Sequence, residues 1–307
     1  MSFFDLFKGP SAESLAAREA ADARRADILH SLERGVVPTG VRQRLEGASS
    51  GKLPWLATLT PAELLTVRSH GIKPIASVSA TCWLHYGWSW TEGHQQGWHA
   101  ALRRLRDEAV AAGANAVLDV KMRTVRLNVR DSMDFTLIGT AVKVADLPPS
   151  PEPIVATVPT LEFVKLLESD VVPTGIAVGA AYEWLTDWQG NASQRWMGNI
   201  EAVKLSQFWN RVRRRSYQEL RNNARDQGNG VLAHIDFSQM FEVERDKQPK
   251  QFLARHIVVA TTVDALPGAR FPHEIKMAVD VHAGATALVG TTRHHQSYES
   301  NDKEGAI

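Results

Sequence analysis

The side chains of this sequence best suited to chemistry are one thiol and three imidazoles that lie close together along the chain. They are Cys82, His85, His94 and His99. Soft divalent metals bind thiolate and imidazole groups at fixed spacing, so these residues form a candidate metal site. The chain has no Cys-x-x-Cys pair, and side chains five positions apart on a helix, such as His94 and His99, point about 140° apart. The competing interpretation is a buried thiol with surface histidines. At an interface in a ring, however, neighbouring subunits could each contribute ligands to one metal.

Aromatic side chains in the same region form a second candidate site. Trp83, Tyr86, Trp88 and Trp90 are close in sequence, and Trp98 follows on a predicted helix. Aromatic faces stack on planar ligands such as bases or flavins. Tryptophan and tyrosine are also enriched at interfaces between subunits or repeats. We favour the interface interpretation.

A predicted helix near residue 212 carries a group of arginines on a broad arc away from its apolar stripe. These residues are Arg211, Arg214, Arg215, Arg221 and Arg225. Such a face could neutralise phosphates or pair with an acidic partner. A solvated face offset by nearby carboxylates is the favoured interpretation, and the net charge of +1 argues against a generally basic nucleic-acid binder. Nucleic acid is therefore not the expected partner.

Signatures of catalysis are lacking in this sequence. It has no P-loop and no dinucleotide-binding glycine fingerprint. The G-x-S-x-G pattern of serine hydrolases occurs at 47–51, but it requires a strand before the serine and a helix after it, and we expect a polar loop there. His234 and His256 fall on facing predicted strands, which indicates a structural pair more often than a base. We expect a protein that is not an enzyme.

Composition constrains the compartment. The single cysteine excludes an internal disulfide framework and indicates a reducing environment. No apolar run approaches the roughly 20 residues of a membrane span, and the N-terminus lacks a secretory signal. We expect a cytoplasmic protein without an integral membrane segment. The N-terminal cluster Phe3, Phe4 and Phe7 could dock a protein partner, or it could fold back on its own domain.

Hydrophobic periodicity predicts the same order of elements twice: strand, helix, strand, strand. The first block runs from Gly71 to Val142 and the second from Val171 to Val263, with a proline-rich linker between them. Gly113, Asn115 and Gly139 are predicted structural turn positions in the first block, and Asn229 takes the place of Asn115 in the second. A phase change in the alternation predicts a β-bulge near Arg123.

Two motifs of the first block carry a family resemblance: Gly113-Ala114-Asn115-Ala116-Val117 and Gly139-Thr140-Ala141-Val142. With the opening from Val67 to Ile75, they resemble the YbjQ family over roughly 63–145 and, more weakly, over 161–265. The resemblance implies a dodecin-like β-α-β-β subunit, assembly into rings, and a heavy-metal-binding label. The second block has Ala260 in place of Gly139 and Gln227 in place of Gly113, so it could have kept the fold without the site.

These observations together predict an α+β protein with two tandem YbjQ-like β-α-β-β units. The expected parts are an N-terminal helical extension (1–62), unit one (63–147), a linker (148–160), unit two (161–267), and a C-terminal strand with a disordered tail (268–307). We expect a non-enzymatic, ring-type homo-oligomer that acts as a binding scaffold. The alternatives are a heavy-metal or small-ligand binder in stress response, and a nucleic-acid-associated protein that uses the arginine face.

Overall fold

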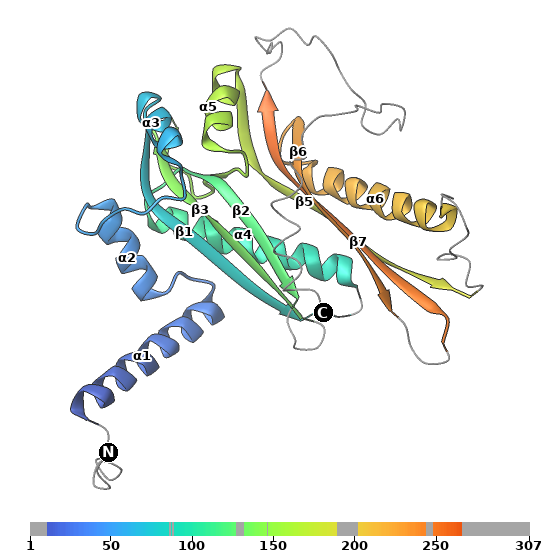
Figure 1. Cartoon of the computed structure of the whole chain (residues 1–307). Coiled ribbons are helices and arrows are strands. Elements are labelled where there is room, and N and C mark those ends of the chain that lie inside the picture. Colours follow the sequence, from blue (N-terminus) through green and yellow to red (C-terminus); the bar gives the residue numbers. More distant parts are fainter. Residues whose placement is uncertain are drawn as a thin grey trace.

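The computed structural model describes residues 11–85, 87, 89–126, 132–145, 147–188, 202–243 and 248–265. Several predicted features lie outside these residues: the N-terminal phenylalanines Phe3, Phe4 and Phe7, the loop aromatics Tyr86 and Trp88, and the C-terminal segment 268–307. Figure 1 shows two sheets, each with a long helix packed against it, and an N-terminal helix that extends away from both sheets.

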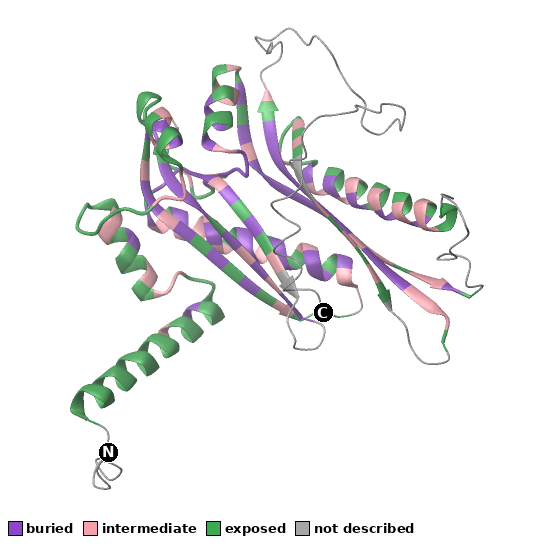
Figure 2. Ribbon diagram, in the orientation of Figure 1, coloured by how far each residue is buried: buried purple, intermediate pink, exposed green. Residues whose placement is uncertain are grey.

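Three helices precede the first sheet. They are α1 (Ala12–Arg34), α2 (Thr39–Ser49) and α3 (Pro61–Ser69). The hydroxyl of Ser11 caps α1, which ends at Gly35 with a φ of 65°, and most of α1 is exposed (Figure 2). Thr60 and Glu63 form a capping box at the start of α3. The G-x-S-x-G pattern falls at the end of α2 and not in a loop, and no strand leads into it.

The first unit follows the predicted order of elements. It contains β1 (Ile72–His85), α4 (Trp90–Ala111), β2 (Ala116–Arg126) and β3 (Ser132–Val144). The strand order in sheet A is β1-β3-β2-β4, where β4 (Ile154–Val155) pairs in parallel with β2. The predicted bulge lies earlier than expected, between Leu118 and Lys121, because Asp119 adopts a φ of 52°. Prolines cannot donate main-chain hydrogen bonds, so the proline-rich linker can join a sheet only at its edge. Strand β4 lies at the edge of sheet A.

The second unit has the same order of elements. It contains α5 (Thr160–Glu168), β5 (Val171–Asp187), α6 (Val203–Ala224), β6 (Gly230–Val243) and β7 (Lys250–Ala265). Sheet B has the order β5-β7-β6, which matches β1-β3-β2 of sheet A. Helix α6 is the arginine-bearing helix that the sequence predicts near residue 212.

Local geometry also repeats between the two units. Pro74 and Pro173 each precede a register shift in the first strand of their unit. Gly71 (φ 69°) and Asp170 (φ 58°) take the same left-handed conformation just before those strands. Because the spacing is constant, residues 54–85 align with 153–184 without a gap.

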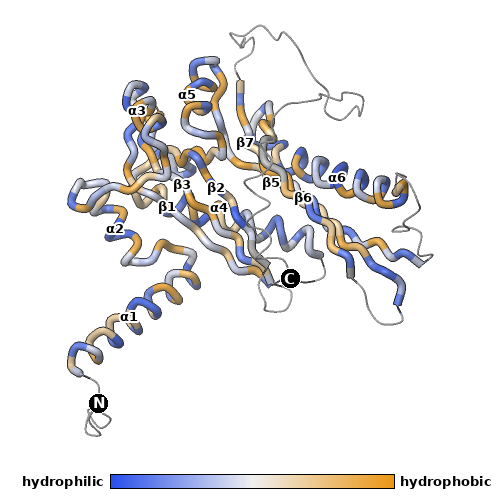
Figure 3. The backbone as a smooth tube through the Cα atoms, in the orientation of Figure 1, coloured by the Kyte–Doolittle hydropathy of each residue, from blue (hydrophilic) through white to orange (hydrophobic). Residues whose placement is uncertain are grey.

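The elements stack in the order sheet A, α4, sheet B, α6 (Figure 1). Trp98 and Leu102 of α4 share one hydrophobic cluster with Val78 of sheet A and with Val178 of sheet B. Because side chains alternate along a strand, Ala177 and Ala181 point to the opposite face of sheet B and pack against α6. Helix α4 is therefore buried on two faces, whereas α6 is covered on one. Figure 3 shows the apolar strands of sheet B beside this more polar helix.

None of the helices in the described part of the chain is long and apolar enough to cross a membrane.

Candidate functional site

The predicted metal ligands on β1 point away from each other. Cys82 is 5% exposed and belongs to the cluster beneath α4. His85 lies three positions later, so strand alternation directs it to the other face, where it is exposed. Burial raises the pKa of the Cys82 thiol, and the opposing effect of Arg104 is smaller. Cys82 is thus a buried, protonated thiol and a poor metal ligand.

His94 has a structural environment. It is fully buried, and the indole N–H of Trp98 donates to its Nε2 at 2.8 Å. Since that nitrogen accepts, the proton of the neutral ring resides on Nδ1, which donates to the hydroxyl of Tyr182 at 3.0 Å. Burial lowers the pKa of His94 from 6.5 to about 3, and Arg255 acts in the same direction. Both ring nitrogens are occupied, and the ring is neutral because burial excludes the charged form.

His99 completes the predicted set and lies elsewhere. It is exposed on α4, and its Nε2 is 3.1 Å from Oδ1 of Asn223 on α6. Within the described part of the chain, no group of three or more His, Cys, Asp or Glu side chains could hold a metal ion. The four candidates therefore do not converge, because the strand and the helix place them on different surfaces.

The described aromatic candidates separate into two environments. Trp98 is 1% exposed and contacts Phe135 edge-on, with ring centroids 5.1 Å apart. Trp90 contacts Tyr182 of the second unit at a centroid distance of 5.8 Å. Trp83 instead lies on the outer face of sheet A and is exposed. Trp90 thus contacts the second unit and Trp98 packs in the core, whereas Trp83 faces solvent.

The predicted turn positions have clear structural roles. Asn115 donates from Nδ2 to the carbonyl of Val144 at 2.9 Å, and the Val144 N–H donates to its Oδ1 at 2.8 Å. Asn229 forms the same pair of bonds with Ala265 at 2.9 and 3.1 Å. Gly113 has a φ of 74°, as expected after a helix.

Gly139 lies where the neighbouring strand leaves no space for a side chain. A Cβ at this position would lie 2.8 Å from a methyl carbon of Val117 and 3.2 Å from the carbonyl oxygen of Leu118. A side chain there would push the two strands apart.

The arginine face of α6 is exposed, as predicted: Arg211, Arg214, Arg215, Arg221 and Arg225. Glu183 of β5 partly offsets this charge. It accepts a bond from Arg211 at 2.8 Å and lies 3.7 Å from Arg215. Exposed pairs of this kind contribute about 0–1 kcal/mol to stability. The face therefore has the solvated, partly neutralised character that the favoured interpretation expected.

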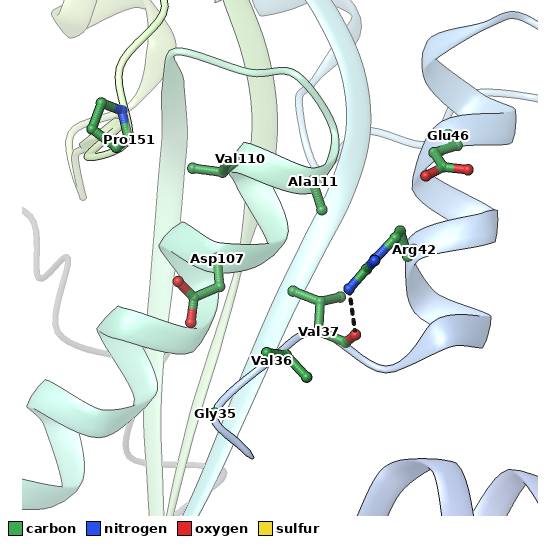
Figure 4. Close-up of a pocket in the computed structure, with 9 residues that line it drawn as sticks. All are labelled: Gly35, Val36, Val37, Arg42, Glu46, Asp107, Val110, Ala111 and Pro151. Atoms are coloured by element: carbon green, nitrogen blue, oxygen red, sulfur yellow. Dashed lines mark hydrogen bonds between the residues drawn. The ribbon is translucent and has the colours of Figure 1, made fainter. Parts of the chain in front are cut away.

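Two cavities add residues that sequence reasoning did not select. One, of about 370 Å³, lies between the turn after α1, helix α2 and helix α4 (Figure 4). Arg42 crosses its wall and donates to the carbonyl of Val37 at 3.4 Å. Asp107 also lines it, and burial raises the pKa of that carboxyl.

The other cavity, of about 420 Å³, lies between the two units and contains Arg106. Arg106 lies off the main apolar stripe of α4, and a single apolar stripe predicts only one buried face. Because sheet B covers a second face of α4, Arg106 lies between this helix and the second unit.

Comparison with known proteins identifies one segment of the chain. The sequence model of the YbjQ_1 family, described as "Putative heavy-metal-binding", matches residues 88–145. This range contains α4, β2 and β3. No curated protein and no solved structure matches the chain. The chain is therefore similar to this family over part of its first unit, and the match does not extend to the second.

Proposed function

We propose that this chain is a non-enzymatic module that assembles head to tail with further copies of itself. One observation carries the proposal. The segment that opens the second unit docks on the first unit, whereas the equivalent segment that opens the first unit has exposed apolar side chains. We name these segments the docked opening (residues 153–164) and the free opening (residues 54–65). They are equivalent because they align without a gap.

The docked opening is held to the edge of sheet A by main-chain hydrogen bonds. The N–H of Ile154 donates to the carbonyl of Asn115, and the N–H of Ala156 donates to that of Val117, both at 3.0 Å. The N–H of Val120 returns a bond to Ala156 at 3.0 Å. This is strand addition, in which main-chain bonds provide affinity and side-chain pockets provide specificity.

A threonine pair marks the next residue of both openings. The N–H of Thr157 donates to Oγ1 of Thr261 at 3.0 Å, and the two hydroxyls are 2.9 Å apart. The N–H of Thr58 donates to Oγ1 of Thr140 at 2.8 Å, and those hydroxyls are also 2.9 Å apart. Each opening is thus fixed on its own unit in the same way. The free opening is already oriented for docking elsewhere.

Exposure distinguishes the two openings. Val155 is fully buried, whereas its equivalent Leu56 is 66% exposed. Val164 is 3% exposed, whereas its equivalent Leu65 is 70% exposed. Side chains that are buried in one unit and open in the other mark a contact that a second copy can complete.

Sheet B offers the matching edge. Within the described residues it has three strands, and β6 lacks a counterpart of β4. Val231 of β6 is 40% exposed, whereas the equivalent Val117 beside β4 is fully buried. The outer edge of β1 is blocked, because Arg44 donates to the carbonyl of Ser77 and Glu108 accepts from the N–H of Ser79, both at 3.1 Å. An edge strand that pairs with no further strand among the described residues is a candidate site for strand addition.

This contact joins two different surfaces, so it builds a ring or an open filament. A ring made of whole chains contains an even number of units. Beyond the added strand, the contact is only partly apolar, through the exposed Trp83 and Ile138 of sheet A. Sheet A exposes Ser79 and Thr81 on the face where sheet B buries Val178 and Ala180. We therefore expect assembly that depends on protein concentration.

Leu56→Asp tests the proposal, because a carboxylate cannot enter the apolar site beside β6 that corresponds to the site of Val155 beside β2. Native mass spectrometry and light scattering of the full chain should show an oligomer for the wild type and a monomer for Leu56→Asp. The control Leu29→Asp changes an exposed α1 residue and should remain oligomeric. A wild-type monomer at all concentrations, or an assembled Leu56→Asp protein, would contradict the proposal.

The family match favours heavy-metal binding as a second candidate function. The donor set of the described residues does not fit this function within one chain, because Cys82 and His85 point to opposite faces. A soft divalent metal would need ligands contributed by several copies. Elemental analysis of protein purified without chelator or affinity-tag metal tests this candidate. Stoichiometric metal in the wild type that is absent from a Cys82→Ala, His85→Ala variant would support this function. Unchanged metal content in the variant would show that Cys82 and His85 are not metal ligands.

A further inference from the structure

A polar cavity of about 420 Å³ lies between one end of the α4–sheet B contact and the turn after α6, and it is separate from the surfaces proposed for assembly. Its volume lies within the range of small-molecule sites. Eight residues of α4, the linker, β5 and the turn after α6 line it: His99, Leu102, Arg106, Glu152, Thr174, Ile176, Asp226 and Gln227.

Arg106 is the lining residue of this cavity that carries a buried side-chain atom without a partner among the described residues. Its Nε is buried and has no hydrogen-bond partner among the described residues. Burial lowers the pKa of the guanidinium, and the charge of Glu152 opposes this effect only in part. Buried polar atoms are normally paired, so an unpaired guanidinium nitrogen beside a cavity indicates a missing acceptor.

Gly175 keeps the space in front of Arg106 open. A Cβ at this position would lie 3.5 Å from Nη2 of Arg106 and 2.7 Å from Oε1 of Gln227. A single methyl group would therefore occupy the gap between the guanidinium and the opposite wall. The glycine does not adopt a left-handed conformation, so the space and not the backbone requires it.

The opposite wall is fixed in place by its own hydrogen bonds. The amide of Gln227 donates to the carbonyl of Asn223 at 2.9 Å, and its Oε1 accepts from the hydroxyl of Thr262 at 3.4 Å. Thr174 donates to the main chain of Gln227 and lies 3.0 Å from Oγ1 of Thr262. Such a wall pre-organises a site and lowers the cost of ordering it on binding.

Charges at the mouth have the opposite sign to Arg106. Glu152 and Asp226 are exposed where the cavity meets solvent. A guanidinium binds carboxylates through two parallel N–H···O bonds. We infer that this cavity binds a small zwitterion of the amino-acid class, with its carboxylate on Arg106 and its ammonium group toward Glu152 and Asp226.

The site is complete within one chain, so it does not depend on assembly. Thermal unfolding and titration calorimetry should be carried out on the full chain with each of the twenty common amino acids. At least one should raise the unfolding temperature in a saturable way, because a ligand that binds only the folded state stabilises it. Its N-acetylated form, which lacks the ammonium group, should bind on the order of tenfold more weakly.

Arg106→Met should abolish this shift, and Arg103→Met, on the exposed side of the same helix, should keep it. Without ligand, Arg106→Met should unfold at a higher temperature than the wild type, since an unpaired buried cation is removed. This result also shows that the variant folds. Gly175→Ala, which narrows the cavity, should weaken binding.

Three results would overturn the inference. They are no response to any amino acid, a response that persists in Arg106→Met, and equal binding of N-acetylated ligands or inorganic phosphate. The last result would show that the cavity binds oxyanions in general and does not recognise the ammonium group.

Discussion

Acidification should loosen the contact between the two units through His94. This residue joins Trp98 of the first unit to Tyr182 of the second, and it does so as a neutral ring. A proton on Nε2 would displace the indole donor and place a charge in a fully buried position. Lowering the pH is therefore the perturbation, and His94→Gln is the variant that does not titrate.

The magnitude follows from the pKa of His94. Burial lowers it to about 3 from the ordinary 6.5. Above 6.5 the ring is neutral in both folded and unfolded chains, and there is no penalty. Below 6.5 only the unfolded chain takes up the proton, so stability falls by about 1.4 kcal/mol per pH unit until the folded-state pKa is reached. Between about pH 7 and pH 4.5 the loss attributable to His94 is roughly 2.7 kcal/mol.

Urea unfolding at these two pH values measures the effect. The free energy of unfolding should fall by roughly 2.7 kcal/mol more in the wild type than in His94→Gln. Other groups, such as Glu108 and Asp119, whose carboxyl pKa values are raised by burial, titrate equally in both proteins. Their effects cancel in the comparison. Equal losses in the two proteins would refute the assignment of a neutral, buried His94.

Two further substitutions test the packing of the second unit, each with a counterpart as control. Thr261→Val removes the hydroxyl that pairs with the buried N–H and hydroxyl of Thr157 and should cost about 2–3 kcal/mol in urea unfolding, whereas Thr140→Val, whose partner is half-exposed, should cost about 1 kcal/mol. Equal costs would contradict the reasoning. Gly179→Ala places a Cβ 2.0 Å from a main-chain oxygen of α6 and should cost about 3 kcal/mol. In the control Gly40→Ala, the new Cβ meets no atom within 4 Å, so this variant should be neutral or slightly stabilising. An unchanged stability of Gly179→Ala would contradict the expected clash between β5 and α6.

Much of the fold could be predicted because each element buries a periodic face. Alternation along β1 and helical spacing along α4 are local signals that survive in the structure. Strand β4 was missed because a two-residue strand has no measurable period and its partner lies far along the chain. A signal was nevertheless present: Pro-x-x-Ala-Thr begins at both Pro54 and Pro153. That repeat predicts equivalent openings, although it cannot show that only one of them is docked.

The candidate sites were harder to predict, for two reasons. Cys82 and His85 could have been separated from the sequence, since residues three apart on a strand face opposite ways. The roles of His94 and Arg106 could not, because the partner of His94 is Tyr182 and the cavity of Arg106 is bounded by Gln227. A helix that carries two buried faces becomes evident only when a distant sheet packs on it.

Mixing two single variants gives the sharpest test of head-to-tail assembly. Leu56→Asp removes the free opening and leaves the β6 edge intact, whereas Val231→Glu blocks the edge and leaves the opening intact. Each variant alone should be monomeric, because every contact requires one surface of each kind. A mixture should form a one-to-one dimer and nothing larger, since the two remaining surfaces are both damaged. Assemblies larger than a dimer, or no association at all, would show that the contact does not join these two surfaces.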